Sequence, residues 1–316
     1  MHRDDPIAQE SLVDRRSLSS SGLIVSPLKL CNAGSTGAAG DTSPDQSTEN
    51  PVHLSALEDL SPEFQKHTTC RGISIKNEFL WPQSEEITYS YISGNHRQHS
   101  KVDSGITRWS HYINLTFRRV SSGGSIRISL NDNEGSWSYL GALCLRAHID
   151  SPTMNLQGID DQTEILEDRE KATVLHEFGH AIGLLHEHQS PSRIGEFTLN
   201  EKGIIKYYET SHEWSRAEIQ CQVIDIYKEK HITNFSQFDH KSVMMYPMYP
   251  SHTLEGLELP LNTELSEIDK AFAMVHYPRL EPQIPSPQWT VAHALDVLKA
   301  AAQISMQVIK NTKTLP

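Results

Sequence analysis

The sequence lacks the features that would place it across a membrane or on nucleic acid. None of its apolar runs reaches the roughly 18 residues that a bilayer-spanning helix needs. Lysine and arginine are outnumbered by aspartate and glutamate, 28 to 40, which gives a formal net charge of −12. A nucleic-acid-binding protein is expected to gather a basic surface instead. We therefore expect neither a membrane span nor a nucleic-acid partner.

The amino-terminal part is poor in large apolar residues. Residues 1–16 contain no apolar core of the length that a signal peptide requires, and the more apolar stretch at 22–30 is short and interrupted by polar residues and proline. Residues 32–51 have almost no large apolar side chains. Because Ser, Gly, Thr, Asp and Pro dominate residues 1–70, we expect this part to be disordered or loosely attached.

Cysteine is scarce, and the few residues present permit two interpretations. The chain contains Cys31, Cys70, Cys144 and Cys221. An even number of cysteines permits two disulfides, which could be connected in three ways. Four reduced or buried thiols explain the same residues equally well. The sequence does not choose between these interpretations.

Histidine, in contrast, is concentrated in residues 174–188, VLHEFGHAIGLLHEH. His176 and His180 are four residues apart, so on a helix they lie on one face and can reach a single zinc ion. Glu177 lies about 100° round the helix, beside the metal, where a carboxylate can take a proton from water. Gly183 permits a left-handed turn, after which the chain can bring His186 to the metal. Three protein ligands leave a position for water, as in catalytic zinc sites.

Two motifs carry a resemblance to a known family. Residues 176–186, HEFGHAIGLLH, match HExxHxxGxxH, the extended zinc-binding pattern of the metzincin peptidases, and Glu187 follows as in the astacin branch. Residues 242–246, SVMMY, resemble the astacin Met-turn SxMHY, with Met245 in place of the histidine. The sequence thus resembles an astacin-like metzincin zinc metallopeptidase.

The resemblance implies a fold and a division of the chain. The fold would be α+β and zincin-like: a twisted five-stranded mixed sheet, an active-site helix and a C-terminal helix. The metallopeptidase domain would span residues 71–280, and residues 1–70 would include a possible pro-segment. Residues 281–316 would follow as a linker and a C-terminal amphipathic helix: residues 281–288 are proline-rich, and residues 289–310 have an amphipathic pattern. This helix would dock on the domain or, as the alternative, bind a partner.

Local patterns predict secondary structure in the corresponding order. Alternating or β-branched runs predict four strands, and apolar residues at helical spacing predict helices. The expected strands lie at 87–92, 115–120, 126–130 and 153–156. The first expected helix lies at 100–113 and has Ser100 as its cap. The active-site helix is expected to start between Asp161 and Asp168 and to include the histidines. Two short helices are expected within 207–232, and a further helix from residue 265 onward. Residues 135–145 would form the substrate-binding edge strand by resemblance, whereas the pattern alone also fits an ordinary strand or loop.

The resemblance also implies a role for each residue of the site. His176, His180 and His186 would bind one catalytic Zn²⁺, and Glu177 would be the general base. Tyr246 would be a fifth ligand that stabilises the oxyanion, although a half-buried structural tyrosine is the alternative. Met244 would form an apolar floor, and Glu187 would hold the mature amino terminus by a buried ion pair. His188 is a second candidate for the third ligand, but the family spacing favours His186.

We therefore predict a zinc metalloendopeptidase that cleaves a peptide or protein substrate with metal-activated water. The alternative is a zinc-binding, catalytically inactive homologue that acts as an interaction protein. Met245 and the run after His188, which keeps Pro191 and Arg193 of the family pattern without its acidic neighbours, motivate this alternative, while the intact Glu177 argues against it. The family resemblance implies secretion, whereas no signal peptide is visible, so the compartment stays open, as does the oligomeric state.

Overall fold

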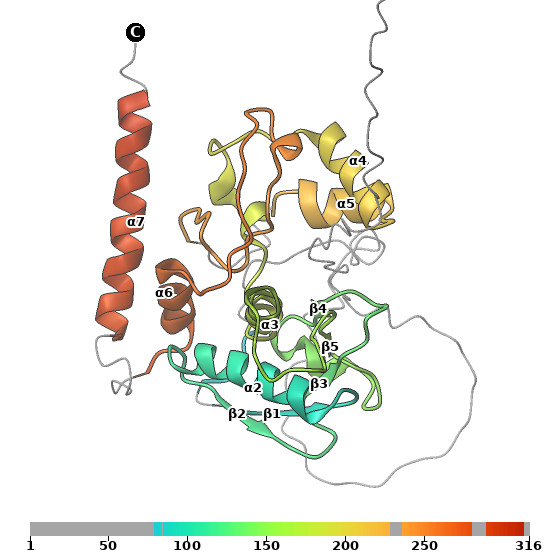
Figure 1. Ribbon diagram of the computed structural model, residues 1–316. Helices are drawn as coiled ribbons and strands as arrows, with labels where there is room; N and C mark the ends of the chain where they lie inside the picture. Colours follow the sequence, from blue (N-terminus) through green and yellow to red (C-terminus); the bar gives the residue numbers. More distant parts are fainter. Residues whose placement is uncertain (1–78, 84, 228–235, 280–288, 313–316) are drawn as a thin grey trace, which may run out of the picture.

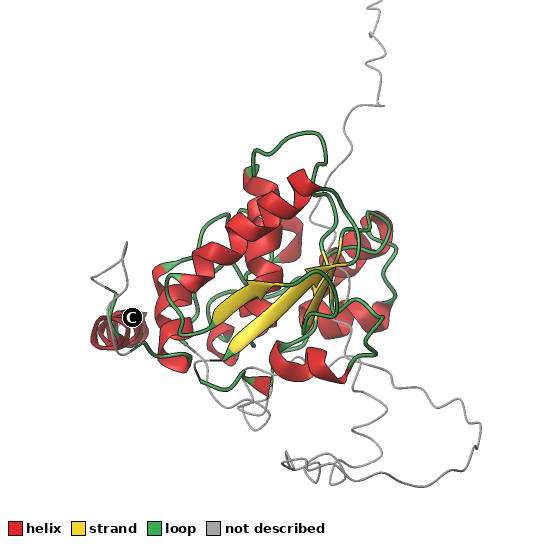
Figure 2. Ribbon diagram, turned by 90° about the horizontal axis from the view of Figure 1, so that it is seen from below, coloured by secondary structure: helices red, strands yellow, loops and turns green. Residues whose placement is uncertain are grey.

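A five-stranded sheet lies at the base of the molecule (Figure 1). The computed structural model describes residues 79–83, 85–227, 236–279 and 289–312, with side chains up to residue 302. The strands are β1 (Glu86–Tyr91), β2 (Thr116–Arg119), β3 (Ile126–Ser129), β4 (Trp137–Ser138) and β5 (Met154–Asn155). Their order in the sheet is β2-β1-β3-β5-β4, and only β4 runs antiparallel to its neighbour. The predicted mixed five-stranded sheet is therefore confirmed, and Figure 2 shows its twist.

Alternate side chains along a strand point to the same face of the sheet, and in this sheet the apolar ones lie on the face covered by helices. Ile87 and Tyr89 of β1 are two residues apart, as are Ile126 and Ile128 of β3, so each pair points to one face. All four belong to the main hydrophobic core. Two helices, α2 (His96–Ser110) and α3 (Asp168–Ala181), complete that core, and Figure 1 shows both on the same side of the sheet.

Helix α2 begins earlier than predicted. Its cap is Asn95, whose side chain accepts hydrogen bonds from the main-chain N–H groups of Arg97 and Gln98, while the Gln98 side chain accepts from the Asn95 N–H. The prediction of Ser100 as the cap is wrong, because this reciprocal capping box already satisfies the first turn. The Asn-x-x-Gln spacing was present in the sequence and was the stronger signal.

Helix α3 starts within the predicted interval, after Glu167, and ends where the glycine signal placed its end. Gly183 has φ of +96°, the left-handed conformation that glycine adopts without a Cβ penalty. The expected pattern of one buried face is incomplete, because every residue from Glu170 to Ala181 is buried. Leu185, expected on that face, lies beyond the helix and is only partly buried. The helix passes through the interior and is enclosed on all sides.

The predicted edge strand is much shorter than residues 135–145. Only Trp137 and Ser138 form β4, and residues Gly141–Arg146 form a 3₁₀-helix. Gly141 has φ of +49°, and a Cβ there would collide with the main-chain carbonyl of Phe79. This close approach turns the chain away from the sheet after two paired residues. The last predicted strand, 153–156, likewise reduces to β5.

The C-terminal half is mainly helical. It contains α4 (Glu201–Ser211), α5 (Arg216–Ile219) continued by a π-helical turn (Gln220–Ile224), α6 (Glu267–His276) and α7 (Val291–Thr312). Helix α6 is the C-terminal helix that the pattern from residue 265 predicts. Helix α4 lies mostly before the predicted interval of 207–232, which contains its end and α5. The expectations for residues 1–70 and for the linker at 281–288 lie outside the described residues.

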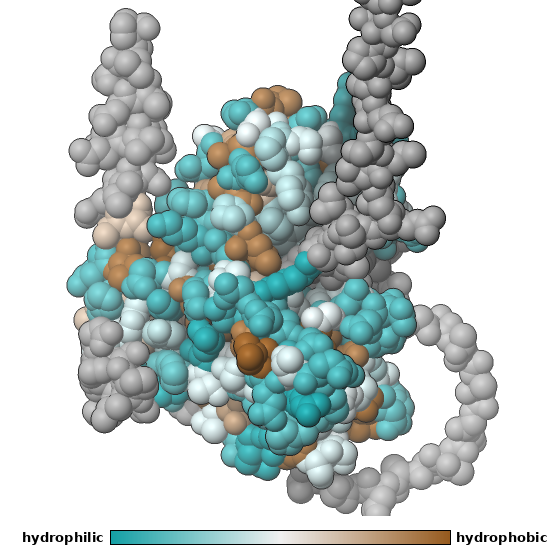
Figure 3. Space-filling view, viewed as in Figure 1, coloured by the Kyte–Doolittle hydropathy of each residue, from teal (hydrophilic) through white to brown (hydrophobic). Residues whose placement is uncertain are grey.

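Helix α7 stands beside α6 at one side of the molecule (Figure 1). Trp289 and Ala294 pack with Ala271 and Met274 of α6, so the predicted C-terminal helix docks on the domain through its first turns. Among the helices that the structure describes, none is both long and apolar enough to cross a bilayer. The face shown in Figure 3 is mainly hydrophilic, with separate hydrophobic patches, one of them where α7 meets α6.

Candidate active site

Two of the predicted metal ligands lie on α3, and main-chain carbonyls fix their rings. The Nδ1 atom of His176 lies 2.9 Å from the carbonyl oxygen of Val243, and Nδ1 of His180 lies 2.8 Å from that of Leu184. A carbonyl oxygen only accepts hydrogen bonds, so each Nδ1 carries the proton. The Nε2 atom of each ring is left with a bare lone pair, which is the form that binds a metal.

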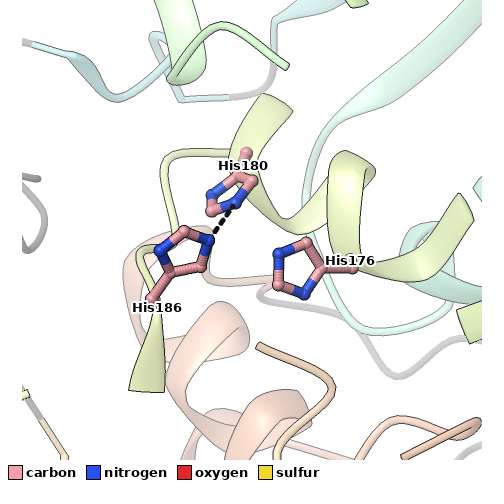
Figure 4. A group of neighbouring side chains, drawn as sticks. All are labelled: His176, His180 and His186. Atoms are coloured by element: carbon pink, nitrogen blue, oxygen red, sulfur yellow. Dashed lines mark hydrogen bonds between the residues drawn. The ribbon is translucent and has the colours of Figure 1, made fainter. Parts of the chain in front are cut away.

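His186 reaches the same place after the turn at Gly183. Its Nδ1 lies 3.1 Å from the side-chain oxygen of Gln189, which assigns the same tautomer as in the other two histidines. The ligand atoms of His176, His180 and His186 all lie within 4.8 Å of one another. Figure 4 shows the three imidazoles pointing toward a common centre. The structure thus brings together the three residues that the sequence selects.

The distances between these rings fit a metal ion. The Nε2 atoms of His180 and His186 are 3.2 Å apart, and with both protons on Nδ1 two lone pairs face each other. Such an arrangement is repulsive unless a cation lies between them. Two nitrogens at 2.0–2.1 Å from a tetrahedral zinc ion would be about 3.3 Å apart. Nε2 of His176 is buried without a hydrogen-bond partner, which also fits a metal ligand.

Burial keeps the three histidines neutral, as metal ligands must be. It lowers the pKa of His176 to about 4, despite its hydrogen bond to Val243. The pKa values of His180 and His186 also fall well below the usual value, chiefly through burial and then through the neighbouring histidines. Neutral imidazoles therefore face the centre at neutral pH, ready to bind without first losing a proton.

Glu177 is completely buried beside these ligands, and both of its carboxylate oxygens lack a hydrogen-bond partner. Burial raises the pKa of its carboxyl well above the usual value, because no donor or cation offsets the loss of water. A divalent cation at the three histidines would supply the missing positive charge and favour the ionised form. An uncompensated carboxyl next to three bare imidazole nitrogens is the electrostatic signature of a metal site.

Tyr246 and Met244 approach the histidines from the turn at residues 242–246. The Tyr246 ring lies 4.5 Å from the His186 ring and 5.8 Å from the His176 ring, measured between centroids. Its hydroxyl is buried and unpartnered, and burial raises its pKa well above the usual value. Met244 is buried against α3, where a Cβ on Gly179 would collide with its Sδ. The roles that the family resemblance implies for Tyr246 and Met244 stay predictions.

His188 and Glu187 have environments that the motif alone does not reveal. Nε2 of His188 lies 2.9 Å from the carbonyl oxygen of Gln222, and its ring stacks on His186 rather than joining the ligand set. Glu187 is partly buried and accepts a hydrogen bond of 2.9 Å from the main-chain N–H of Asp239. Within the described residues no cation lies at ion-pair distance from Glu187, so its role toward the amino terminus stays a prediction.

The departures from the family pattern have local packing consequences. Met245 is buried in an apolar cluster with Phe197, Met248 and Leu259. Arg193 is buried as well, and its guanidinium donates to the carbonyl of Phe197 at 3.3 Å. In the described part of the chain Arg193 has no carboxylate at ion-pair distance, which matches the loss of acidic residues around it. Neither departure alters the three histidines.

The cysteines outside this site form no disulfide that the structure describes. Cys144 is a buried thiol, and burial raises its pKa to about 12. Cys221 is also buried and is not bonded to Cys144. Cys31 and Cys70 lie outside the described residues. Cys144 and Cys221 are therefore not bonded to each other, and any pairing with Cys31 or Cys70 lies outside the described residues.

Sequence reasoning missed the groups that hold the ligands. The carbonyls of Val243 and Leu184 belong to the main chain, which the side-chain pattern does not report. Gln189 was one of the altered residues after His188, and no spacing rule marked it as a partner of His186. A glutamine three residues after a ligand, next to a segment of unusual composition, is the only signal that was available.

A twisted mixed sheet, a buried helix bearing two histidines and a third histidine beyond a glycine turn define a domain of the metzincin type. The chain belongs to the astacin family of peptidases, whose model matches residues 74–277. It is 25% identical over 234 residues to the zinc metalloproteinase nas-26 of Caenorhabditis elegans, covering 71% of this chain and 52% of that relative. The chain thus spans about half the length of this curated relative.

Solved structures agree with the family assignment. A structure of myroilysin superposes with a TM-score of 0.59 at 33% identity, covering 64% of this chain and 97% of that one. A second myroilysin structure gives 0.50 at 31% identity, covering 66% and 90%. The α+β metzincin fold is confirmed, and zinc is confirmed as the metal of the family.

Proposed function

We propose that this chain is a zinc-dependent endopeptidase that hydrolyses peptide bonds in a peptide or protein substrate. The observation that carries the proposal is the convergence of three neutral histidines beside the unpartnered carboxyl of Glu177. In this proposal His176, His180 and His186 hold the zinc ion. Zinc, when bound, supplies a Lewis acid that polarises the scissile carbonyl and acidifies water.

The residues of the chain then move the protons. The Glu177 carboxylate takes a proton from the attacking water and afterwards delivers it to the amine that leaves. Tyr246 donates a hydrogen bond from its phenol to the carbonyl oxygen as that oxygen becomes negative. Two observations support this pairing: the Tyr246 hydroxyl has no hydrogen-bond partner within the described residues, and the nearby Glu177 adds to burial and Tyr208 in raising the pKa of Tyr246.

Strand β4 supports the proposed mode of substrate binding. It is the last strand in the sheet order, so one side of it pairs with β5 and the other is not paired within the sheet. A strand edge without a pairing partner can offer main-chain donors and acceptors to an extended peptide. We therefore propose that the substrate backbone adds to β4, which would hold the scissile bond near the end of α3.

Glu177→Gln tests the general-base role. The amide keeps the size of the side chain but takes no proton, so we expect zinc to stay bound while hydrolysis falls by about 10² to 10⁴-fold or more. Casein cleavage and the bound-metal content of both proteins measure these quantities. A chelator should abolish hydrolysis by the wild type, and zinc should restore it.

The inactive-homologue alternative predicts a different outcome from the same assay. The wild type would then bind zinc with the metal-to-protein ratio of a single site and cleave no peptide, so that Glu177→Gln would change nothing. Hydrolysis by the wild type that survives in Glu177→Gln would instead overturn the assignment of the general base while leaving the zinc site in place.

A further inference from the structure

We propose that Gln189 is a positioning residue for the third zinc ligand, and that the segment from Cys221 to Tyr227 holds it in place. In this role the side-chain oxygen of Gln189 sets both the orientation and the tautomer of the His186 ring. The inference rests on the proposed zinc site and deepens it. It assigns the segment from Cys221 to Tyr227, which lies far from the histidine motif in the sequence, a role in holding the zinc site.

The three ligands differ in what fixes them. Main-chain carbonyls hold Nδ1 of His176 and His180, at 2.9 and 2.8 Å. Only His186 is held by a side chain, with its Nδ1 at 3.1 Å from Oε1 of Gln189. A main-chain carbonyl stays in place as long as the fold does, whereas an amide side chain must itself be oriented. His186 is therefore the ligand whose geometry depends on a further residue.

Four hydrogen bonds orient the Gln189 amide. Its Nε2 donates to the carbonyl oxygens of Cys221 and Asp225, at 2.6 and 2.9 Å. Its Oε1 accepts from the Tyr227 hydroxyl at 2.9 Å in addition to the proton of His186. Because both partners of Nε2 only accept hydrogen bonds, the amide has no alternative flipped orientation. All donor and acceptor capacity of this buried side chain is thereby used.

The segment that orients Gln189 is also hydrogen-bonded to the residues that directly follow His186. The Tyr227 N–H donates to the carbonyl oxygen of Gln189 at 2.9 Å, and the carbonyl of Gln222 receives the Nε2 proton of His188 at 2.9 Å. Tyr227 and Gln222 are both buried. The π-helical turn at Gln220–Ile224 thus accepts hydrogen bonds from both His188 and Gln189, which follow His186.

Loss of the Oε1 contact should weaken metal binding without removing a ligand. Without an acceptor at Nδ1, His186 can place its proton on Nε2, where it blocks the metal, and the ring can rotate. Removing a hydrogen-bond partner of a metal-binding histidine typically costs 10–100-fold in metal affinity. We expect Gln189→Met, which has similar length but neither donor nor acceptor, to bind zinc about 10–100-fold more weakly.

Two further variants separate positioning from a merely structural role. Gln189→Glu keeps an acceptor for His186 but cannot donate to Cys221 and Asp225, so it should lose stability as Gln189→Met does and yet recover most of the zinc affinity. Gln220→Met is the matched control, because Gln220 directly precedes this segment, is exposed, and bonds only the Asp225 carboxylate from its side chain. Its zinc affinity should stay within about twofold of the wild type.

Zinc affinity is measured by competition with a chelator, and the ring tautomers by ¹⁵N NMR of the metal-free protein. In the wild type all three ligands should carry the proton on Nδ1. In Gln189→Met only His186 should change, because the carbonyl partners of His176 and His180 remain. The NMR measurement on the wild type needs no variant to fold: a proton found on Nε2 of His186 overturns the proposal.

Failure of this inference differs from failure of the zinc site. If the wild type binds zinc no more tightly than His186→Ala, the proposed site is wrong. If the wild type binds tightly and Gln189→Met equals it, the site stands and Gln189 has no positioning role. If Gln189→Met and Gln189→Glu lose affinity equally, the role is structural and the proposal is also overturned.

Discussion

Gly179 is the residue at which α3 comes closest to the turn beneath the histidines. It lies between the two helical ligands, and a Cβ at this position would collide with Sδ of Met244 and approach Trp109 at 3.5 Å. Glycine in a helix interior is otherwise unfavourable relative to alanine. Its presence here allows the helix and the methionine to pack in direct contact, which sets the distance between α3 and the Met-turn.

Gly179→Ala should therefore destabilise the protein, although alanine is the better helix former. The helix gain of about 1 kcal/mol is offset by overpacking of about 1–3 kcal/mol. Urea unfolding of the wild type and the variant measures the difference. Met244→Ala in the same chain should recover part of the loss, because it removes the colliding atoms, and the double-mutant cycle gives the coupling. A variant more stable than the wild type would show that Met244 moves without cost.

At the residue scale the sequence selected the three histidines and Glu177, but it did not reveal the groups that hold the histidine rings in place. His176, Glu177, His180 and His186 follow from spacing on one helix and one glycine turn, which are local properties. The Nδ1 atoms of the three histidines bond the main-chain carbonyls of Val243 and Leu184 and the side chain of Gln189. Contacts made by main-chain atoms leave no trace in residue identities, so no pattern could have found them.

At the scale of elements, Asp269 connects α6 to the Met-turn. Its carboxylate accepts from the Ser242 hydroxyl at 2.6 Å, from the Val243 N–H at 2.8 Å and from the Ser266 N–H at 3.0 Å. Ser266 in turn caps α6 by accepting from the Asp269 N–H. The same main-chain unit, Val243, binds Nδ1 of His176 through its carbonyl. One carboxylate thus ties a helix start to the support of a ligand.

Burial raises the pKa of Asp269 to about 6, against the lowering effect of its three donors. The folded protein then keeps a proton that the unfolded chain, with a pKa of about 3.9, releases. This contribution to the free energy of unfolding is fully present below about pH 4 and is lost as the pH rises through about 6, by about 3 kcal/mol.

The test compares wild type with Asp269→Asn, both free of metal, by denaturant unfolding from about pH 4 to about pH 7. The stability of the wild type relative to the variant should fall by about 3 kcal/mol across this range. The buried histidines titrate in both proteins and cancel in the difference. A difference that stays constant with pH would contradict the raised pKa of Asp269.

Elements with strong local signals were predicted with nearly the observed bounds, whereas the strands fixed by tertiary contacts were predicted too long. The strands β1 and β3 and the helices α3, α6 and α7 have clear periodicity or capping residues. Strands β4 and β5 have two paired residues each, too few for a period to show. Their place in the sheet depends on the pairing of Ser138 with Met154, which is set by the fold and not by either short run.

At the scale of the whole molecule, α7 is attached to the domain through its packing against α6 and Tyr112. The Trp289 ring packs edge-on against Tyr112, with centroids 5.3 Å apart, and against α6. Leu295 is not part of this cluster and is 39% exposed. The division of the chain at residues 70 and 280 stays a prediction, with the family model covering residues 74–277 between those limits.

Trp289→Ala should release α7 while leaving the histidine site intact. Removing a large buried side chain costs on the order of 3 kcal/mol, so hydrogen exchange in α7 should accelerate by about 100-fold. Zinc affinity should not change, because no residue of the site contacts Trp289 among its packing partners. Leu295→Ala is the control and should leave exchange nearly unchanged. Equal acceleration in both variants would show that Trp289 does not anchor the helix.

The hydrogen bond between His176 and Val243 joins residues that are 67 positions apart. The three imidazoles come from one short stretch, so their approach to one another needs little long-range folding. Their correct orientation, however, requires the distal half of the chain to have returned to α3. The affinity of this site for zinc therefore depends on whether both halves of the chain have assembled. A chain cut between the two halves would still contain all three histidines and yet bind zinc weakly.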